Sequence, residues 1–257
     1  MENPSQLPVP GSERRRKPRS PRIMQTALIT AVIVATIFVA FSPNSFTGSF
    51  GDSMAVLLTT EPDVVIVAGT SRPVVKVGIV AGHLGNDSGA VCENGMTEGE
   101  VNLKIANIVQ QQLSAQGIET DLLKEKDPRL NGYRAAALVS IHNDSCDFIN
   151  DQAKGYKVAA AKSSHDINLA NRLEACLRDR YQLRTNMPLH ASVTNDMTFY
   201  HAFNEIDPRT PAAIIETGFL NLDYDFLTKD TNTVAQGVTD GIICFIDNQN
   251  IVPTATP

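Results

Sequence analysis

The chain has 257 residues and a formal net charge of -6 at pH 7, which gives room for one domain of about 170 to 190 residues plus flanking segments. Six Lys and Arg residues against two Glu residues give the first 22 residues a charge of +4, which leaves -10 for the remainder. Nucleic-acid phosphates need a clustered basic surface, so a domain this acidic excludes nucleic acid as a partner.

The N-terminal segment combines a basic tail with an apolar run. Residues 1–22 carry the cations, and residues 23–41 have no charged side chain. This run is close to the roughly 20 residues that cross a bilayer as one helix. It predicts a single transmembrane anchor, and the basic tail predicts a cytoplasmic N-terminus with the rest of the chain outside, on the periplasmic or cell-wall side. The alternative is a cleaved signal peptide, but the run exceeds the usual h-region of about 7 to 15 residues and no A-x-A-like site follows it.

Three further segments complete the chain. Residues 42–72 mix turn-forming residues with two short apolar stretches, and form either a spacer or an extra strand at the edge of the domain. Residues 73–248 form the domain itself. Residues 249–257 end in Pro, Thr and Ala, and are predicted to be a disordered tail.

Within the domain, β-rich apolar runs alternate with segments of helical period. This alternation indicates an α/β fold, with a twisted, mostly parallel sheet between two layers of helices. The predicted strands span residues 74–80, 118–123, 137–142, 156–160 and 212–216.

The helices are predicted from their caps and apolar stripes. Thr97 and Glu100 have the spacing of a capping box, and Gly117 provides a stop for the first helix. A second helix is predicted over residues 164–179 and a third over residues 234–245. The inward-facing residues of the second helix are expected to be Leu169, Leu173, Cys176 and Leu177.

Polar residues with catalytic chemistry stand where three predicted strands end. His83 follows the first strand, His142 closes the third, and Glu216 closes the fifth. Ligands gather beyond the carboxyl ends of parallel strands, and Glu98, in the first turn of the first helix, can point to the same region. Each residue alone has a structural explanation, such as a hydrogen-bonded histidine or an acid at a helix N-terminus.

Taken together, these residues have the composition of a metal site. Two histidines and one glutamate are the ligand set of many catalytic zinc sites, with the fourth position left for water. A further glutamate can serve as the general base. The carboxylate of Glu216 is costly to bury without a partner, which favours a functional role.

Four stretches of the chain resemble the zinc-dependent N-acetylmuramoyl-L-alanine amidases of the type-3 amidase class, over about residues 74–247. The resemblance implies that Zn²⁺ is the cofactor, that His83, Glu98 and His142 are its ligands, and that Glu216 is the catalytic carboxylate. It also implies hydrolysis of the bond between N-acetylmuramic acid and L-alanine in bacterial peptidoglycan. The stretches are residues 82–90, residues 98–103, Arg134 with residues 140–145, and residues 211–220.

The chain departs from the family pattern around both histidines. Val80 stands where the family usually has an acidic residue, and Leu84 where it has a second glycine. If the missing acid orients the ligand histidine through its second ring nitrogen, Asp87 or a backbone carbonyl must replace it. After His142, residues 143–144 are Asn-Asp where the family has a small residue and an asparagine. These changes bear on metal affinity and substrate preference rather than on the fold.

Three other residues are candidates for substrate binding. Arg134 matches a family arginine, with a structural ion pair as its alternative role. His190 and His201 lie between the second helix and the strand of Glu216. His165, at a helix N-terminus, is expected to be solvated.

The four cysteines face an oxidising exterior if the predicted topology holds. Cys176 and Cys244 fall on apolar helix faces, where small buried thiols are expected. Cys92 and Cys146 follow the two ligand histidines, so the metal site brings their loops together; the alternatives are a disulfide and two unpaired thiols.

Two other functions remain open from the sequence. One is a zinc peptidase that cuts within the stem peptide, and the other is a wall-binding module with a decayed site. The presence of all four polar residues favours an enzyme over a decayed site. An activator protein is a further partner that the sequence does not identify.

Overall fold

The computed structural model describes residues 74–251. The predicted basic tail, transmembrane helix and linker lie outside these residues, as does most of the predicted C-terminal tail. Within residues 74–251, no helix has both the length and the apolar character needed to cross a membrane.

A five-stranded sheet forms the centre of the domain, in the order β2-β1-β3-β5-β4. Four strands are parallel, and β4 is antiparallel to β5. This arrangement confirms the predicted mostly parallel α/β sheet, and all five predicted strands are present. Their bounds are β1 Lys76–Ala81, β2 Glu119–Lys124, β3 Ala137–Asp144, β4 Lys157–Ala160 and β5 Ala212–Phe219.

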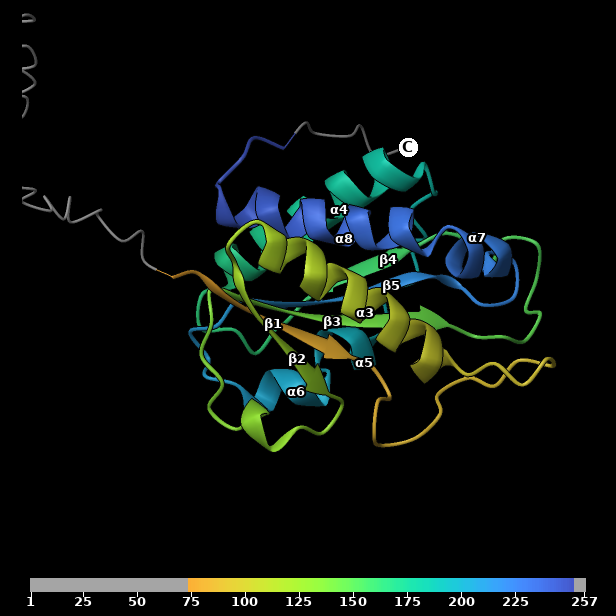
Figure 1. Ribbon diagram of the computed structural model, residues 1–257, viewed down its shortest axis with the longest axis horizontal. Coiled ribbons are helices and arrows are strands. Elements are labelled where there is room, and N and C mark those ends of the chain that lie inside the picture. The colour runs from red at the N-terminus through yellow and green to blue at the C-terminus, as the bar shows by residue number, and fades with distance from the viewer. Residues whose placement is uncertain (1–73, 252–257) are drawn as a thin grey trace, which may run out of the picture. The chain divides into compact units, whose positions relative to one another are not determined.

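Helices cover both faces of the sheet (Figure 1). One face carries the long helices α3 (Glu98–Ala115), α4 (Ile167–Thr185) and α8 (Thr231–Ile246), with the short α7 (Tyr224–Lys229) before α8. The other face carries the short elements η1 (Pro128–Leu130), α5 (Asn195–Thr198) and α6 (His201–Glu205).

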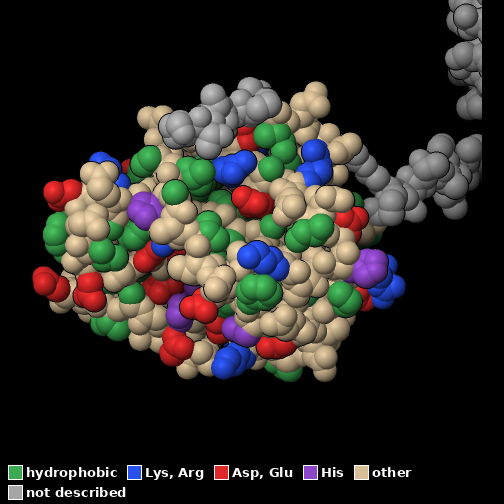
Figure 2. Space-filling view, turned by 180° about the vertical axis from the view of Figure 1, so that it is seen from behind, with side chains coloured by type: hydrophobic (Ala, Val, Ile, Leu, Met, Phe, Trp, Pro, Cys, Tyr) green, Lys and Arg blue, Asp and Glu red, His purple; other side chains and the backbone are tan. Residues whose placement is uncertain are grey.

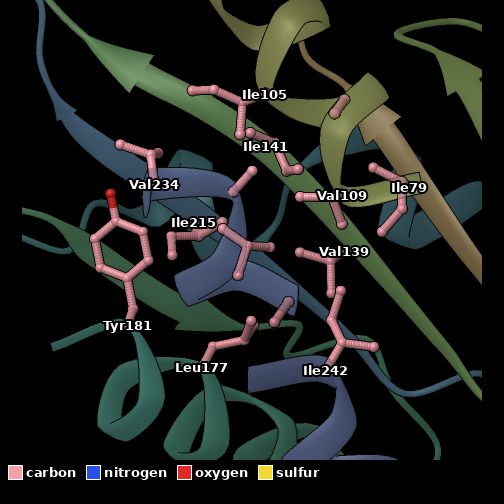
Figure 3. Packing of buried hydrophobic residues seen from close by; sticks show 14 of the residues in the cluster. Ile79, Ile105, Val109, Val139, Ile141, Leu177, Tyr181, Ile215, Val234 and Ile242 are labelled. Atoms are coloured by element: carbon pink, nitrogen blue, oxygen red, sulfur yellow. The ribbon is translucent and has the colours of Figure 1, made fainter. Parts of the chain in front are cut away.

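Alternation along β3 sends its side chains into two separate cores. Val139 and Ile141 pack against Ile105 of α3 and Ile242 of α8 (Figure 3). Leu138 packs with the residues of η1, α5 and α6 on the opposite face. Because successive side chains of a strand point to opposite faces, His142 shares the face of Leu138. The His142 side chain, near the end of β3, therefore lies on the side of the short helices.

The predicted caps of the first helix are confirmed. Thr97 caps α3, its hydroxyl accepts from the backbone N–H of Glu100, and the Glu100 carboxylate accepts from the backbone N–H of Thr97. Gly117 follows the helix with φ 77°, a left-handed conformation that glycine adopts without strain. This capping fixes where α3 begins and so fixes the position of Glu98 in its first turn.

The second helix differs from its prediction in both its bounds and its buried face. It begins at Ile167, because the Asp166 carboxylate accepts from the backbone N–H groups of residues 168 and 169. It ends at Thr185, six residues later than predicted, before Asn186 in the left-handed conformation. Leu169 is 40% exposed, so its predicted inward orientation is wrong.

The prediction of two free thiols at Cys176 and Cys244 is also wrong, because these residues form a disulfide between α4 and α8. Gly241 explains how the helices come so close. A Cβ at this position would lie 2.7 Å from the Cα of Leu177. The apolar helix faces that suggested buried thiols are the faces that bring the two sulfur atoms together.

Candidate metal centre and its surroundings

His83, Glu98 and His142 converge at the carboxyl edge of the sheet, each offering one ligand atom within 4.8 Å of the others. The Nε2 atom of His83 lies 3.2 Å from Oε1 of Glu98, and the Nδ1 atom of His142 lies 3.3 Å from the same oxygen. On the face shown in Figure 2, histidine side chains lie among acidic ones. The three residues predicted as metal ligands from the sequence are therefore brought together.

Two glycines allow this close convergence. A Cβ at Gly82 would lie 2.3 Å from the His142 ring, and a Cβ at Gly89 would lie 2.5 Å from a carboxylate oxygen of Glu98. Real Cβ atoms do not approach other atoms so closely. The backbone of the loop after β1 can therefore lie directly against both candidate ligands only because these positions lack a side chain.

His83 is fixed by an unusual backbone conformation and by Asp87. Its φ of 65° is left-handed, which is uncommon for a residue other than glycine. Its Nδ1 atom lies 2.5 Å from Oδ1 of Asp87, and that oxygen also accepts from the backbone N–H of Gly89. Asp87 thus replaces the acid that the family pattern places at the position of Val80, as the sequence allowed, and leaves Nε2 free to face Glu98.

A buried network of hydrogen bonds holds the Glu98 carboxylate in place. The side-chain amide of Asn102 donates to Oε1 of Glu98 at 3.1 Å, and the backbone N–H of Asn143 approaches the same oxygen at 3.3 Å. The Asn143 side-chain amide donates to Oδ1 of Asn102, and the Thr217 hydroxyl donates to Oδ1 of Asn143. This hydrogen-bond network links α3, β3 and β5. The sequence analysis found no signal for it.

Glu98 and His83 hold each other in opposite charge states. Burial alone raises the pKa of Glu98, but its hydrogen bonds to His142 and His83 outweigh burial and hold that pKa well below its ordinary value. The hydrogen bond to Glu98, against the opposing effect of burial, raises the pKa of His83 to about 9. At neutral pH the carboxylate is thus ionised and a proton is retained on His83, which a metal ion must displace when it binds.

Glu216 stands beside the cluster in a different environment. It pairs in register with His142 across β3 and β5. Its Oε2 atom is buried and has no hydrogen-bond partner among the described residues. Burial, together with the charge of Glu98 and despite that of His142, raises the pKa of Glu216 to about 7. A carboxylate with these properties can take and return a proton near neutral pH.

Lys157 and Asp144 form an ion pair next to Glu216 that sequence analysis missed. Lys157 is buried, pairs in register with Glu216 across β4 and β5, and bonds the Asp144 carboxylate. Its ammonium also lies 4.8 Å from the centre of the Phe219 ring. A lysine within the apolar strand of residues 157–160 was the available signal, since a charge there needs a buried partner.

The three candidate substrate-binding residues occupy different surroundings. Arg134 is exposed and lies 3.9 Å from Asp207, the ion pair considered as its alternative role. The His190 ring packs edge-on against Phe219, beside Lys157. His201 is held between Glu125 and Glu205, at 2.7 and 3.1 Å.

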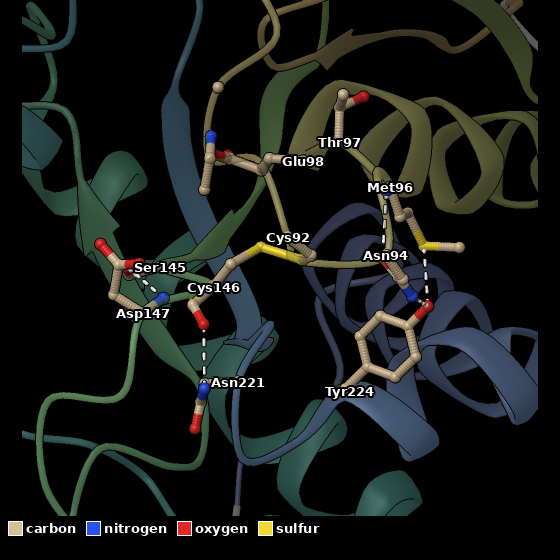
Figure 4. Close-up of a disulfide and its surroundings, with 12 residues drawn as sticks. Cys92, Asn94, Met96, Thr97, Glu98, Ser145, Cys146, Asp147, Asn221 and Tyr224 are labelled. Atoms are coloured by element: carbon tan, nitrogen blue, oxygen red, sulfur yellow. Dashed lines mark hydrogen bonds between the residues drawn. A yellow bond between two sulfur atoms is a disulfide. The ribbon is translucent and has the colours of Figure 1, made fainter.

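A disulfide between Cys92 and Cys146 joins the two loops that follow His83 and His142 (Figure 4). Of the two alternatives from the sequence, the structure thus has the bond. A cavity of about 470 Å³ lies beside this disulfide. Its lining includes both cysteines, Phe148 and Tyr224, but none of the three candidate ligands.

The fold and the cluster define a three-layer α/β protein with a candidate metal centre at the carboxyl edge of its sheet. Residues 77–244 match the model of a protein family described as N-acetylmuramoyl-L-alanine amidase, and the chain belongs to this family. Its enzyme class is therefore that of the amidases, and the family's action on peptidoglycan extends to this chain.

Solved structures with the same fold include several amidases. The N-acetylmuramoyl-L-alanine amidase from Clostridium difficile 630 is 22% identical, with a TM-score of 0.57, over 70% of this chain and 100% of that one. The catalytic domain of CwlV from Bacillus (Paenibacillus) polymyxa is 26% identical, with a TM-score of 0.50, over 67% and 98%. The CwlD amidase from Clostridioides difficile, in complex with the GerS lipoprotein, is 20% identical, with a TM-score of 0.55, over 68% and 99%. No curated protein sequence matches the chain.

Proposed function

We propose that this protein is a zinc-dependent amidase that hydrolyses the bond between N-acetylmuramic acid and the L-alanine of the stem peptide. One observation carries the proposal: Glu216, whose Oε2 atom is buried without a hydrogen-bond partner among the described residues, stands in register with one member of a His-Glu-His cluster. An ion-pair network that served stability alone would not leave a buried carboxylate oxygen unpaired beside it.

The donor set of the cluster suits zinc. Zinc favours nitrogen and oxygen ligands in a tetrahedral arrangement, and catalytic sites supply three protein ligands with a fourth position open. His83, Glu98 and His142 offer two ring nitrogens and one carboxylate oxygen. Zinc held there would lower the pKa of a coordinated water toward neutrality and polarise the scissile carbonyl.

The protein's own residues account for the proton transfers. Glu216, ionised at neutral pH in a fraction of molecules because its pKa is about 7, accepts a proton from the attacking water. As the new C–O bond forms and the amide C–N bond breaks, Glu216 returns this proton to the departing amine of L-alanine. Asp87, Asn102 and Asn143 keep the cluster oriented during both steps.

The test is digestion of purified peptidoglycan by the full chain, with the products identified by mass spectrometry. An amidase releases stem peptides with a free L-alanine amine and leaves the lactyl carboxyl group on the glycan. A peptidase instead creates a new amino terminus within the stem, and that product would overturn the proposed bond. A decayed wall-binding module would sediment with peptidoglycan and release nothing.

We also propose that residues 23–41 anchor the enzyme in the cell membrane, with the domain on the outer side. The apolar run and the basic tail before it support this topology. Protease added to intact protoplasts should remove the domain. A domain that survives protease until the protoplasts are lysed would rule out the outward orientation.

A further inference from the structure

A third glutamate, Glu125, is buried beside the candidate metal centre and has no role in the chemistry above. It directly follows β2 and is 5% exposed. Both of its oxygens are used. Oε2 accepts from the backbone N–H of His83 at 2.8 Å, and Oε1 lies 2.7 Å from Nε2 of His201.

Glu125 also reaches the second histidine of the cluster. The Nδ1 atom of His142 faces Glu98, so its Nε2 atom points away from the cluster. There it meets the Tyr200 hydroxyl at 3.4 Å and Oε2 of Glu125 at 3.9 Å. Burial and the nearby charge of the Glu125 carboxylate raise the pKa of Tyr200, so its hydroxyl stays protonated.

These contacts place one carboxylate behind both histidines. Metal-ligating histidines commonly use their second ring nitrogen to bond a group that fixes the ring, and that group tunes metal affinity. For His142, Nε2 contacts the Tyr200 hydroxyl and faces the Glu125 carboxylate beside it. For His83 the ring is held by Asp87, and Glu125 holds the backbone in its left-handed conformation.

We propose that Glu125 is a positioning residue of the metal site, which orients His83 through its backbone and His142 through Tyr200. The inference rests on the proposed zinc-dependent function. An alternative role, as a partner of His201 that serves folding alone, does not explain why the other oxygen is bonded to a candidate ligand. A buried carboxylate costs free energy unless its bonds repay it, and here one of these bonds holds the backbone of a candidate ligand.

The substitution Glu125→Gln tests the proposal with almost no change of shape. Glutamine is uncharged and has a single acceptor oxygen, so it cannot accept from both His83 and His201. We expect the full chain with this substitution to bind zinc roughly 10- to 100-fold more weakly in competition with a chelator. We also expect a changed visible spectrum of the Co²⁺-loaded protein, because the spectrum reports ligand geometry.

Glu205→Gln is the matched control. Glu205 bonds the other ring nitrogen of His201 but is exposed and does not reach His83 or His142. Its substitution should leave zinc affinity within about twofold of wild type, as expected for a contact outside the site. Equal affinities for wild type and Glu125→Gln, or an equal loss in both variants, would overturn the proposal.

Tyr200→Phe keeps the test decisive if Glu125→Gln does not fold without metal. This variant retains Glu125 and its bond to His83, and removes only the hydroxyl at His142. We expect a several-fold weaker zinc affinity and an altered Co²⁺ spectrum. If Glu125→Gln is unfolded and Tyr200→Phe behaves as wild type, Glu125 serves folding and the inference fails. If wild type itself binds no zinc, the proposed function fails instead.

Discussion

Glu98 and Glu216, which both lie near His142, show how different surroundings suit two residues of the same type to different roles in the candidate site. Glu98 lies at the capped end of α3, where Asn102 bonds its carboxylate and the hydrogen bonds to two histidines outweigh burial and hold its pKa low. Glu216 lies within β5, where burial without a partner for Oε2 raises its pKa to about 7. The first is suited to stay charged and bind a cation, and the second is suited to exchange a proton.

The difference comes from the elements rather than from the residue type. A helix N-terminus offers unpaired N–H groups and loops that can bond a carboxylate. The middle of a buried strand offers neither, because its backbone groups are used by the sheet. The predictions below separate the two glutamates, from the largest expected effect to the smallest.

Removal of the Glu98 carboxylate should have the largest effect. In Glu98→Ala the cluster loses one of three ligand atoms, so zinc should fall from about one per chain to almost none, and activity to background. Metal content by mass spectrometry and peptide release from peptidoglycan measure both effects. Glu100→Ala is the matched control, because it removes a nearby carboxylate but keeps the Thr97 hydroxyl bond to the residue 100 backbone that caps α3, and this variant should keep its zinc. Zinc bound at full occupancy in Glu98→Ala would contradict the ligand role.

Glu216→Gln should abolish most turnover and spare the metal. Glutamine keeps the shape of the side chain but cannot accept the proton, and the loss of a general base costs roughly 10²- to 10⁴-fold in rate. The variant should remain folded and hold about one zinc per chain, as measured by circular dichroism and metal analysis. Near-normal turnover would remove Glu216 from its assigned role, whereas loss of zinc would make it a ligand.

In the metal-free protein the two glutamates should shift stability in opposite directions. The pKa of Glu216 is raised, so its contribution to stability is present below about pH 4.5 and is lost as pH rises through about 7. Glu216→Gln should therefore raise the free energy of unfolding at pH 8, by on the order of 2 to 4 kcal/mol, and should change it little at pH 4.

Glu98→Gln should show the reverse. Because the pKa of Glu98 is lowered, its contribution to stability is present above about pH 4.5 and is lost as pH falls. The variant should be less stable than wild type at pH 8, with a deficit that shrinks in acid. Urea unfolding in excess chelator at both pH values checks the two variants side by side. Shifts of the same sign would mean that the environments of the two carboxylates do not differ as described.

The sequence predicted the residues whose placement follows from strand order. His142 and Glu216 end apolar runs that were predicted as strands of a mostly parallel sheet, and the capping box at Thr97 fixed the position of Glu98. A carboxyl end of a strand is a local property of the chain, and parallel pairing brings such ends to one edge. Sequence could therefore predict the cluster without knowing any side-chain contact.

The remaining features depend on tertiary contacts that leave no local pattern. Glu125 stands in the charged run of residues 124–127, which has the composition of a solvated turn, although its carboxylate is buried. The bond between Cys176 and Cys244 requires α4 and α8 to approach at Gly241. Leu169 fits the periodicity of the helix but lies in its first turn, where the core does not extend.

The smallest expected effect comes from the network behind Glu98. The buried Thr217 hydroxyl donates to Oδ1 of Asn143, and Thr217→Val removes it without a change of shape, which should cost about 1 to 3 kcal/mol of stability. Asn143 then holds Glu98 less firmly, so zinc affinity should fall by less than about tenfold, at the lower end of such effects.

Thr239→Val is the matched control, because this buried hydroxyl in α8 donates to Gln112 on α3 rather than to the network. Both variants should lose similar stability in urea unfolding of the metal-free protein, but only Thr217→Val should weaken zinc in a chelator competition. Equal zinc affinities in the two variants would show that Glu98 is held by Asn102 and the histidines alone.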